Sequence, residues 1–155
     1  MARLIPRTHT VLVLLMVFAL SLGLSGCSNQ DVTRPALERD ISTVYGRLLI
    51  KRDQLLRTPT PQTLRVEANC YRGGPDQPDI GPGKDWRCDL HPVDATGALA
   101  DVSYLVIART NGCWSALVET LAATADTVDV ATMIVPSTGQ SVPDPLGGFD
   151  GCLRA

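Results

Sequence analysis

The chain has 155 residues, with 14 basic and 16 acidic side chains that give a formal net charge of −2. A chain of this length holds one small domain rather than two independent cores. Its basic residues form no cluster, which argues against a nucleic-acid partner and against electrostatic attachment to anionic lipid head groups.

The first residues have the form of a secretory signal. Arg3 and Arg7 precede an almost wholly apolar run from Val11 to Leu24, and small residues follow the run. A positive start, a short apolar run and a small-residue exit are typical of a cleaved signal peptide. A membrane-spanning helix needs about 18 or more apolar residues, and this run is shorter.

The exit of this segment, Leu24-Ser25-Gly26-Cys27, resembles the lipobox of bacterial lipoproteins at all four positions. The resemblance implies that a peptidase cuts between Gly26 and Cys27 and that the Cys27 thiol takes a diacylglyceryl group. Two or three acyl chains, such as palmitate, hold a protein at a membrane where a single chain would not. The alternatives are an ordinary signal peptide with a chance cysteine and an uncleaved anchor.

We therefore expect a signal peptide over residues 1–26, a lipidated tether over 27–33 and a single domain over 34–155, on the extracytoplasmic face of the cell membrane. Because Arg3 and Arg7 leave with the signal, 12 basic residues then face 16 acidic ones, and the mature net charge becomes −4.

Residues 34–57 are predicted to form one helix. Pro35 suits the first helical turn, and Thr33 or Asp31 is a suitable N-cap. Apolar residues at helical spacing form a stripe of Leu37, Ile41, Val44 and Leu48, and Leu49 and Leu56 lie beside this stripe. Such a stripe predicts packing on a sheet; a coiled-coil seam is the alternative, although the segment is too short for several heptads.

The Pro-rich segment 58–63 is predicted to be a connector, and the chain after it is predicted to form β-structure. Alternating or β-branched segments predict strands at 64–71, 86–93, 102–108, 113–121 and 131–135. One helix followed by four or five such strands predicts an α+β domain, with the N-terminal helix packed on an antiparallel meander. Because only 5% of residues are aromatic, we expect a mainly aliphatic core.

The connections are predicted from their turn residues. The Gly/Pro/Asp-rich segment 73–85 predicts an exposed loop, and 94–101 predicts a turn. Asn111-Gly112 is typical of a type I′ hairpin, and 136–139 is a further turn. The segment 122–129 is ambiguous, and the tail from Val142 is predicted to be irregular.

Four cysteines remain besides Cys27, and they are Cys70, Cys88, Cys113 and Cys152. An even number outside the cytoplasm predicts a disulfide framework, for which three connectivities are possible. Neighbouring strands of a meander favour Cys70–Cys88, and Cys113–Cys152 ties the tail to the strand after the hairpin. A zinc site is the rival interpretation, but zinc favours cysteines two to four residues apart or nearby histidines.

Few residues are candidates for chemistry, and we predict no catalytic, metal or cofactor site. His91 is the only histidine beyond the signal, and no Gly-x-Ser-x-Gly motif accompanies it, so we expect an exposed structural residue. Acids surround the Gly/Pro loop, but they lack the spacing of a calcium loop and are expected to be solvated: Asp76, Asp79, Asp85 and Asp89.

Two further features of the sequence favour structural roles. Gly81-Pro82-Gly83-Lys84 is not a phosphate loop, because it lacks the first glycine and the Ser or Thr after the lysine. Trp86 and Trp114 lie close to cysteines in sequence. They are candidates for a ligand platform, but packing over a disulfide is the more common role.

The mature chain carries a set of motifs around its cysteines: 70–74 (CYRGG), 81–88 (GPGKDWRC), 112–114 (GCW), 144–146 (DPL) and 149–152 (FDGC). Together they resemble a family of small uncharacterised lipoproteins of high-GC Gram-positive bacteria. The resemblance implies an envelope location and paired cysteines, and it implies no activity.

The sequence therefore favours a non-enzymatic binding or accessory module of the cell envelope that contacts an unknown envelope protein or polymer. One alternative is a small enzyme acting on envelope polymers through Asp85 or Asp89 and His91. Another is a structural spacer or inhibitor. The exposed 73–85 loop is the first candidate for a contact surface.

Overall fold

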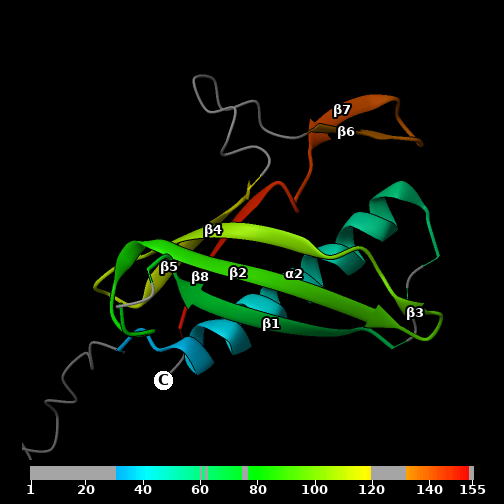
Figure 1. The fold of residues 1–155 in the computed structure, drawn as a ribbon. Coiled ribbons are helices and arrows are strands. Elements are labelled where there is room, and N and C mark those ends of the chain that lie inside the picture. The colour runs from blue at the N-terminus through cyan, green and yellow to red at the C-terminus, as the bar shows by residue number, and fades with distance from the viewer. Residues whose placement is uncertain (1–30, 60, 62, 75–76, 120–131, 154–155) are drawn as a thin grey trace, which may run out of the picture.

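The structure, a computed structural model, describes residues 31–59, 61, 63–74, 77–119 and 132–153. These residues form one long helix and eight strands (Figure 1). The elements are α2 (Arg34–Leu56), β1 (Arg65–Arg72), β2 (Gly83–Asp94), β3 (Gly97–Ala98), β4 (Val102–Ala108), β5 (Cys113–Val118), β6 (Thr132–Val135), β7 (Gln140–Pro143) and β8 (Gly148–Cys152).

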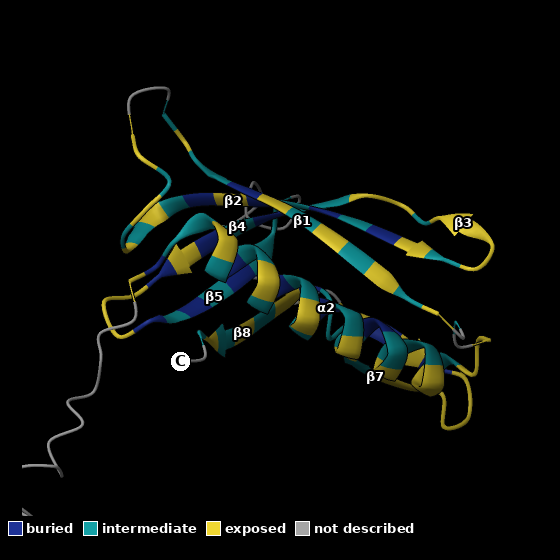
Figure 2. Cartoon of the chain, turned by 90° about the horizontal axis from the view of Figure 1, so that it is seen from below, coloured by how far each residue is buried: buried dark blue, intermediate teal, exposed yellow. Residues whose placement is uncertain are grey.

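The main sheet is antiparallel, with strand order β1-β2-β4-β5-β8 and the short β3 paired to the end of β2. Strands β6 and β7 form a separate hairpin that contacts α2. Helix α2 lies along one face of the main sheet and contacts β1, β2 and β8 (Figures 1 and 2). The predicted α+β class, one helix on an antiparallel sheet of about five strands, is confirmed.

The helix presents a different stripe to the sheet from the predicted one. Its buried residues follow an i, i+4 series, Leu37, Ile41, Tyr45 and Leu49. Val44 is partly buried against the core, but Leu48 is only half-buried and lies outside it. The prediction for Leu48 was wrong. A helical turn has about 3.6 residues, so buried residues spaced four apart move gradually around the helix, and this moves the contact with the sheet away from Leu48. No helix within the described ranges is long and apolar enough to cross a membrane.

The ends of α2 are only partly as predicted. Thr33 occupies the N-cap position and Pro35 lies in the first turn, but the Thr33 side chain makes no capping hydrogen bond. Thr33 instead forms a β-bridge with Ile80. At the other end Arg57 adopts a left-handed conformation, with φ of 57°. Its backbone N–H donates hydrogen bonds to carbonyls of the last helical turn.

The core lies between α2 and the alternate strand residues that face it (Figure 2). Its largest fully buried side chains include Trp86, Trp114 and Tyr104. The rings of Tyr104 and Trp114 meet Phe149 at centroid distances of 5.0 and 5.8 Å. The core is mainly aliphatic by number of residues, as expected, but its largest fully buried side chains are aromatic.

Both predicted disulfides are present, Cys70–Cys88 and Cys113–Cys152. Each joins residues that lie directly opposite in neighbouring antiparallel strands, with Cα–Cα distances of 4.1 and 3.8 Å. The first is fully buried in the core, whereas Cys152 is exposed. Disulfide bonds of this kind constrain the unfolded chain and so stabilise a small core.

The predicted connections needed more revision than the strands. The tail was expected to be irregular from Val142, but it completes β7 and then forms β8 at the edge of the main sheet. The expected type I′ turn is also wrong. The Gly112 N–H donates to the Arg109 carbonyl. A type I′ turn requires positive φ at both central residues, but of Asn111 and Gly112 only Gly112 has a positive φ, at 77°. The ambiguous segment 122–129 lies outside the described residues.

Candidate functional site

The Gly/Pro-rich loop is held by Arg72 at the end of β1. The guanidinium donates two hydrogen bonds to the Asp85 carboxylate, at 3.0 and 2.7 Å, and a third to the Ile80 carbonyl at 3.0 Å. The hydrogen bonds from Arg72 hold the pKa of Asp85 below its usual range. The Arg72 backbone N–H donates to Asp79 at 2.9 Å. Asp85 and Asp79 are thus structural acceptors rather than the solvated acids that we expected.

The outer face of the main sheet, opposite α2, carries a second polar group of residues. Ser103 donates to Asp89 at 2.6 Å. His91 Nδ1 lies 2.9 Å from Asp101 Oδ1, with both side chains well exposed. His91 is exposed as expected, but it has a partner that sequence reasoning missed, because Asp101 belongs to the predicted 94–101 turn and meets His91 only through the pairing of β2 with β4.

These residues do not assemble with the loop acids. Asp85 and Asp89 are four residues apart on the same face of β2, which corresponds to about 13 Å along a strand, and Asp76 lies outside the described residues. Within the described ranges, no three His, Cys, Asp or Glu side chains gather in a group that would hold a metal ion.

Neither tryptophan is available as a ligand platform, because both indoles are buried. The Trp86 N–H donates to the Gly81 carbonyl at 3.1 Å, and the Trp114 N–H donates to Asp40 of α2 at 2.8 Å. Trp114 also lies over Gly151, where an added Cβ would meet the indole at 2.5 Å. The bond to Asp40 therefore fixes α2 against the sheet.

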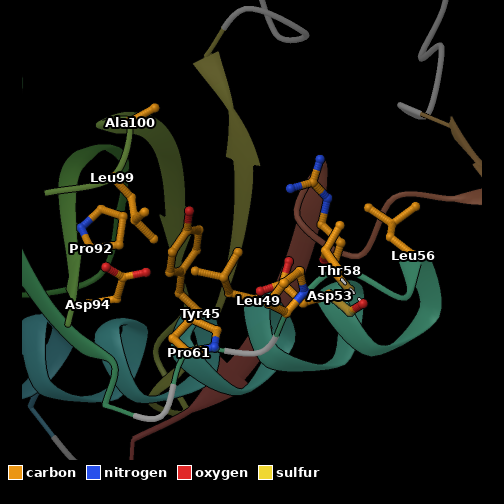
Figure 3. Close-up of a pocket in the computed structure, with 12 residues that line it drawn as sticks. Tyr45, Leu49, Asp53, Leu56, Thr58, Pro61, Pro92, Asp94, Leu99 and Ala100 are labelled. Atoms are coloured by element: carbon orange, nitrogen blue, oxygen red, sulfur yellow. Dashed lines mark hydrogen bonds between the residues drawn. The ribbon is translucent and has the colours of Figure 1, made fainter. Parts of the chain in front are cut away.

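A cleft of about 380 Å³ opens at the C-terminal end of α2, between this end and the β2–β4 connection (Figure 3). Figure 3 shows Tyr45 at its centre, with Pro92 and Leu99 on one side and the last turns of α2 on the other. Its lining residues are Tyr45, Leu49, Arg52, Asp53, Leu56, Thr58, Pro59, Pro61, Pro92, Asp94, Leu99 and Ala100.

Two of the charged groups of the cleft face partners within the protein. Arg52 Nε lies 3.3 Å from Asp144 Oδ2 without hydrogen-bond geometry, so their attraction is Coulombic. Asp94 accepts bonds from the hydroxyl and N–H of Thr96, which lower the pKa of its carboxyl. Burial raises the pKa of Tyr45. Because the tyrosine is neutral at ordinary pH, the cleft offers a mainly apolar floor with charges at its edge, which suits binding more than proton transfer.

The outer face also holds a shallow apolar groove of about 410 Å³ over β4, β5 and β8. Leu105 and Leu117 are directly opposite in register, and Ile107 is exposed beside them. Lys84 and Asp150 lie among its lining residues. The groove and the cleft are two hollows, formed by residues that the structure describes, where a partner would meet apolar side chains.

Sequence reasoning placed the contact surface in the 73–85 loop and missed the cleft. The cleft joins residues about 50 positions apart, such as Tyr45 and Leu99, so no local pattern reveals it. The partnership of Arg72 with Asp85 was also missed, although the opposite charges flanking a Gly/Pro segment were a signal that the loop is closed at its base.

Comparison of the chain with protein-family models, with curated proteins and with solved structures gives no match in any of the three. A functional interpretation therefore depends on the sequence motifs and on the geometry described above.

Proposed function

We propose that this protein is a membrane-anchored extracytoplasmic lipoprotein, attached through Cys27, that acts as a non-enzymatic binding or accessory module of the cell envelope. The observation that carries the proposal is the complete Leu24–Cys27 exit after an apolar signal. A signal of this form exports the chain, and acylation of Cys27 retains it at the membrane.

The disulfides support an oxidising compartment. Cys152 is exposed and Cys113 half-buried, so solvent thiols have access to this bond. In the cytosol, glutathione and thioredoxin keep accessible thiols reduced, whereas disulfides persist outside it. Two bonds between directly opposed strand residues are thus consistent with a domain that works beyond the cytoplasmic membrane.

The cleft at the end of α2 is the contact site that we favour. It combines Tyr45, Leu99 and Pro92 with charged groups at its edge, and this mixture is typical of pockets that bind by apolar contact and orient by a few polar groups. Asp94 and Arg52 already have protein partners. A partner therefore gains mainly from covering the apolar floor.

Intact-mass analysis of the membrane-extracted protein tests the anchor. We expect a mature chain that begins at Cys27 and carries acyl chains, and we expect Cys27→Ser to lose both the acyl mass and membrane retention. A Cys113→Ala/Cys152→Ala variant is the matched control, because it removes two cysteines and should keep the lipid. An unmodified mature form that begins elsewhere would refute the proposal.

Titration of the isotope-labelled protein with solubilised cell-wall fragments and with envelope-protein extracts, followed by NMR, tests the binding site. Shifts should concentrate on the cleft and disappear in Leu99→Arg, which places a charge on its floor. Ile134→Arg is the control, because Ile134 is exposed on β6 and lies outside the lining of the cleft.

An enzyme acting on envelope polymers is the second candidate, favoured by the proximity of His91, Asp101, Asp89 and Ser103 on the outer face. The same titration separates the two. Turnover of a cell-wall fragment by the native protein, lost in His91→Gln, would favour the enzyme hypothesis over the binding-module hypothesis.

A further inference from the structure

The chain becomes part of the fold immediately after the expected tether. Val32 is only 2% exposed. The Gly81 N–H donates to the Val32 carbonyl at 2.6 Å, and Thr33 forms a β-bridge with Ile80. The Arg34 N–H donates to the Asp79 carbonyl at 3.2 Å. From Val32 onward, the entering chain is therefore fixed by backbone bonds to the segment 77–83, which we call the entry loop.

The distance between the lipid and this fixed point is short. Five residue steps separate Cys27 from Val32, and an extended chain spans at most about 3.6 Å per residue, or roughly 18 Å in all. Helix α2 has 23 residues, which at 1.5 Å each make it about 35 Å long. The tether therefore holds Val32 and the start of α2 within about 18 Å of the embedded Cys27, which is about half the length of the helix.

The entry loop presents a surface that suits lipid head groups. Its outermost apolar side chain, Ile80, is 48% exposed, and Pro78 and Pro82 beside it are exposed as well. Two acids at this end of the molecule are paired. Asp79 lies 3.5 Å from Arg34, and Asp85 lies 2.7 Å from Arg72. These paired acids reduce the repulsion that an anionic bilayer would otherwise exert on this end.

We propose that the entry loop rests on the bilayer surface, with Ile80 among the lipid head groups, and that the cleft is held at the opposite end of the molecule, facing away from the membrane. Figure 1 shows this polarity, because the first turn of α2 and β3 lie at opposite ends of the domain. This inference rests on the lipid anchor of the proposed function. It assigns the protein an orientation in which the cleft reaches partners beyond the membrane surface.

Tryptophan quenching by brominated lipids tests the orientation. The native Trp86 and Trp114 are fully buried and should not contact lipid, so a tryptophan added at the surface reports its own depth. The lipidated protein is reconstituted in vesicles of phosphatidylcholine and phosphatidylglycerol with brominated acyl chains. The test variant is Ile80→Trp, and the matched control is Ile134→Trp on the exposed β6, where Ile134 is 66% exposed.

We expect the emission of Ile80→Trp to shift to the blue and to lose about half or more of its added intensity, whereas Ile134→Trp keeps the emission of a solvated indole. Equal quenching of the two variants, or an unquenched Ile80→Trp, overturns the orientation. Intact mass measured on the same samples separates the two ideas. Acylated protein with unquenched Ile80→Trp refutes the orientation alone, and protein without acyl chains refutes the anchor and the orientation together.

Discussion

The contribution of the surface disulfide can be measured by replacing Cys113 and Cys152 together with alanine. The two residues are separated by 39 positions. Loop-closure entropy for a crosslink of that span stabilises the folded state by about 4 kcal/mol, compared with about 3 kcal/mol for the 18-residue separation of Cys70 and Cys88. The Cys113–Cys152 variant gives the cleaner estimate, because Cys70 and Cys88 are fully buried and their replacement also leaves a cavity.

The structure also indicates where the loss should appear. Strand β8 remains attached through the N–H of Leu153, which donates to the Gly112 carbonyl, and through Phe149, whose ring packs on Trp114 and Tyr104. We therefore expect the variant to fold, with earlier opening of the edge strand. Urea unfolding gives the free energy, and hydrogen exchange at the amides of β8 gives the local opening.

Two results would refute this reasoning. A loss below about 1 kcal/mol would mean that the bond adds little beyond the packing of Phe149, in conflict with the loop-closure estimate. Unchanged exchange protection in β8 would mean that the strand does not depend on the crosslink for its pairing with β5.

Three further substitutions test the helix, its end and the core. Leu49→Asp should cost about 3 kcal/mol or more, because it places a charge in the buried layer, whereas Leu48→Asp should lower the melting temperature much less; equal losses would contradict the observed helix face. Arg57→Gly should raise the unfolding free energy by about 1 kcal/mol in urea titrations, because glycine adopts positive φ without strain. Tyr104→Phe should cost about 1 kcal/mol through the lost hydrogen bond to the Leu146 carbonyl. Burial also raises the pKa of Tyr104, so the wild type should lose stability as the pH rises above about 10, where tyrosine ionises in the unfolded chain first; the Phe variant should lose less over the same range.

The parts of the fold that local pattern determines were predictable. The helix was predicted at 34–57 and occupies Arg34–Leu56, and the strand predicted at 102–108 has the same limits in the structure. The Cys70–Cys88 pair followed from strand adjacency, because consecutive strands of a meander place their residues opposite one another. In each case the deciding interaction lies within a segment or between neighbouring segments.

The errors arose where a distant partner decides the structure. The predicted stripe did not include Tyr45, yet the centroid of its ring lies 6.1 Å from that of Tyr104. The tail 148–152 contains two glycines, which are unfavourable in isolated strands. Trp114 covers Gly151 from the adjacent strand and supplies the packing that the glycine lacks. Neither effect can be read from the local sequence.

Two glycines of the motifs around the cysteines have structural roles. An added Cβ at Gly83 would lie 2.5 Å from the Arg72 guanidinium, so this glycine leaves room for the pair with Asp85. Gly151 leaves room for Trp114 in the same way. Chains that share these motifs are therefore expected to share the fold.

Those motifs carry little information about activity. They cover residues 70–74, 81–88, 112–114, 144–146 and 149–152, and none of the residues that line the cleft falls within them. If the cleft binds the partner, specificity can change by substitution at exposed lining positions such as Ala100 without disturbing the cysteines, the loop or the core. The motif positions would then maintain the scaffold, while the residues at the C-terminal end of α2 determine what the protein contacts.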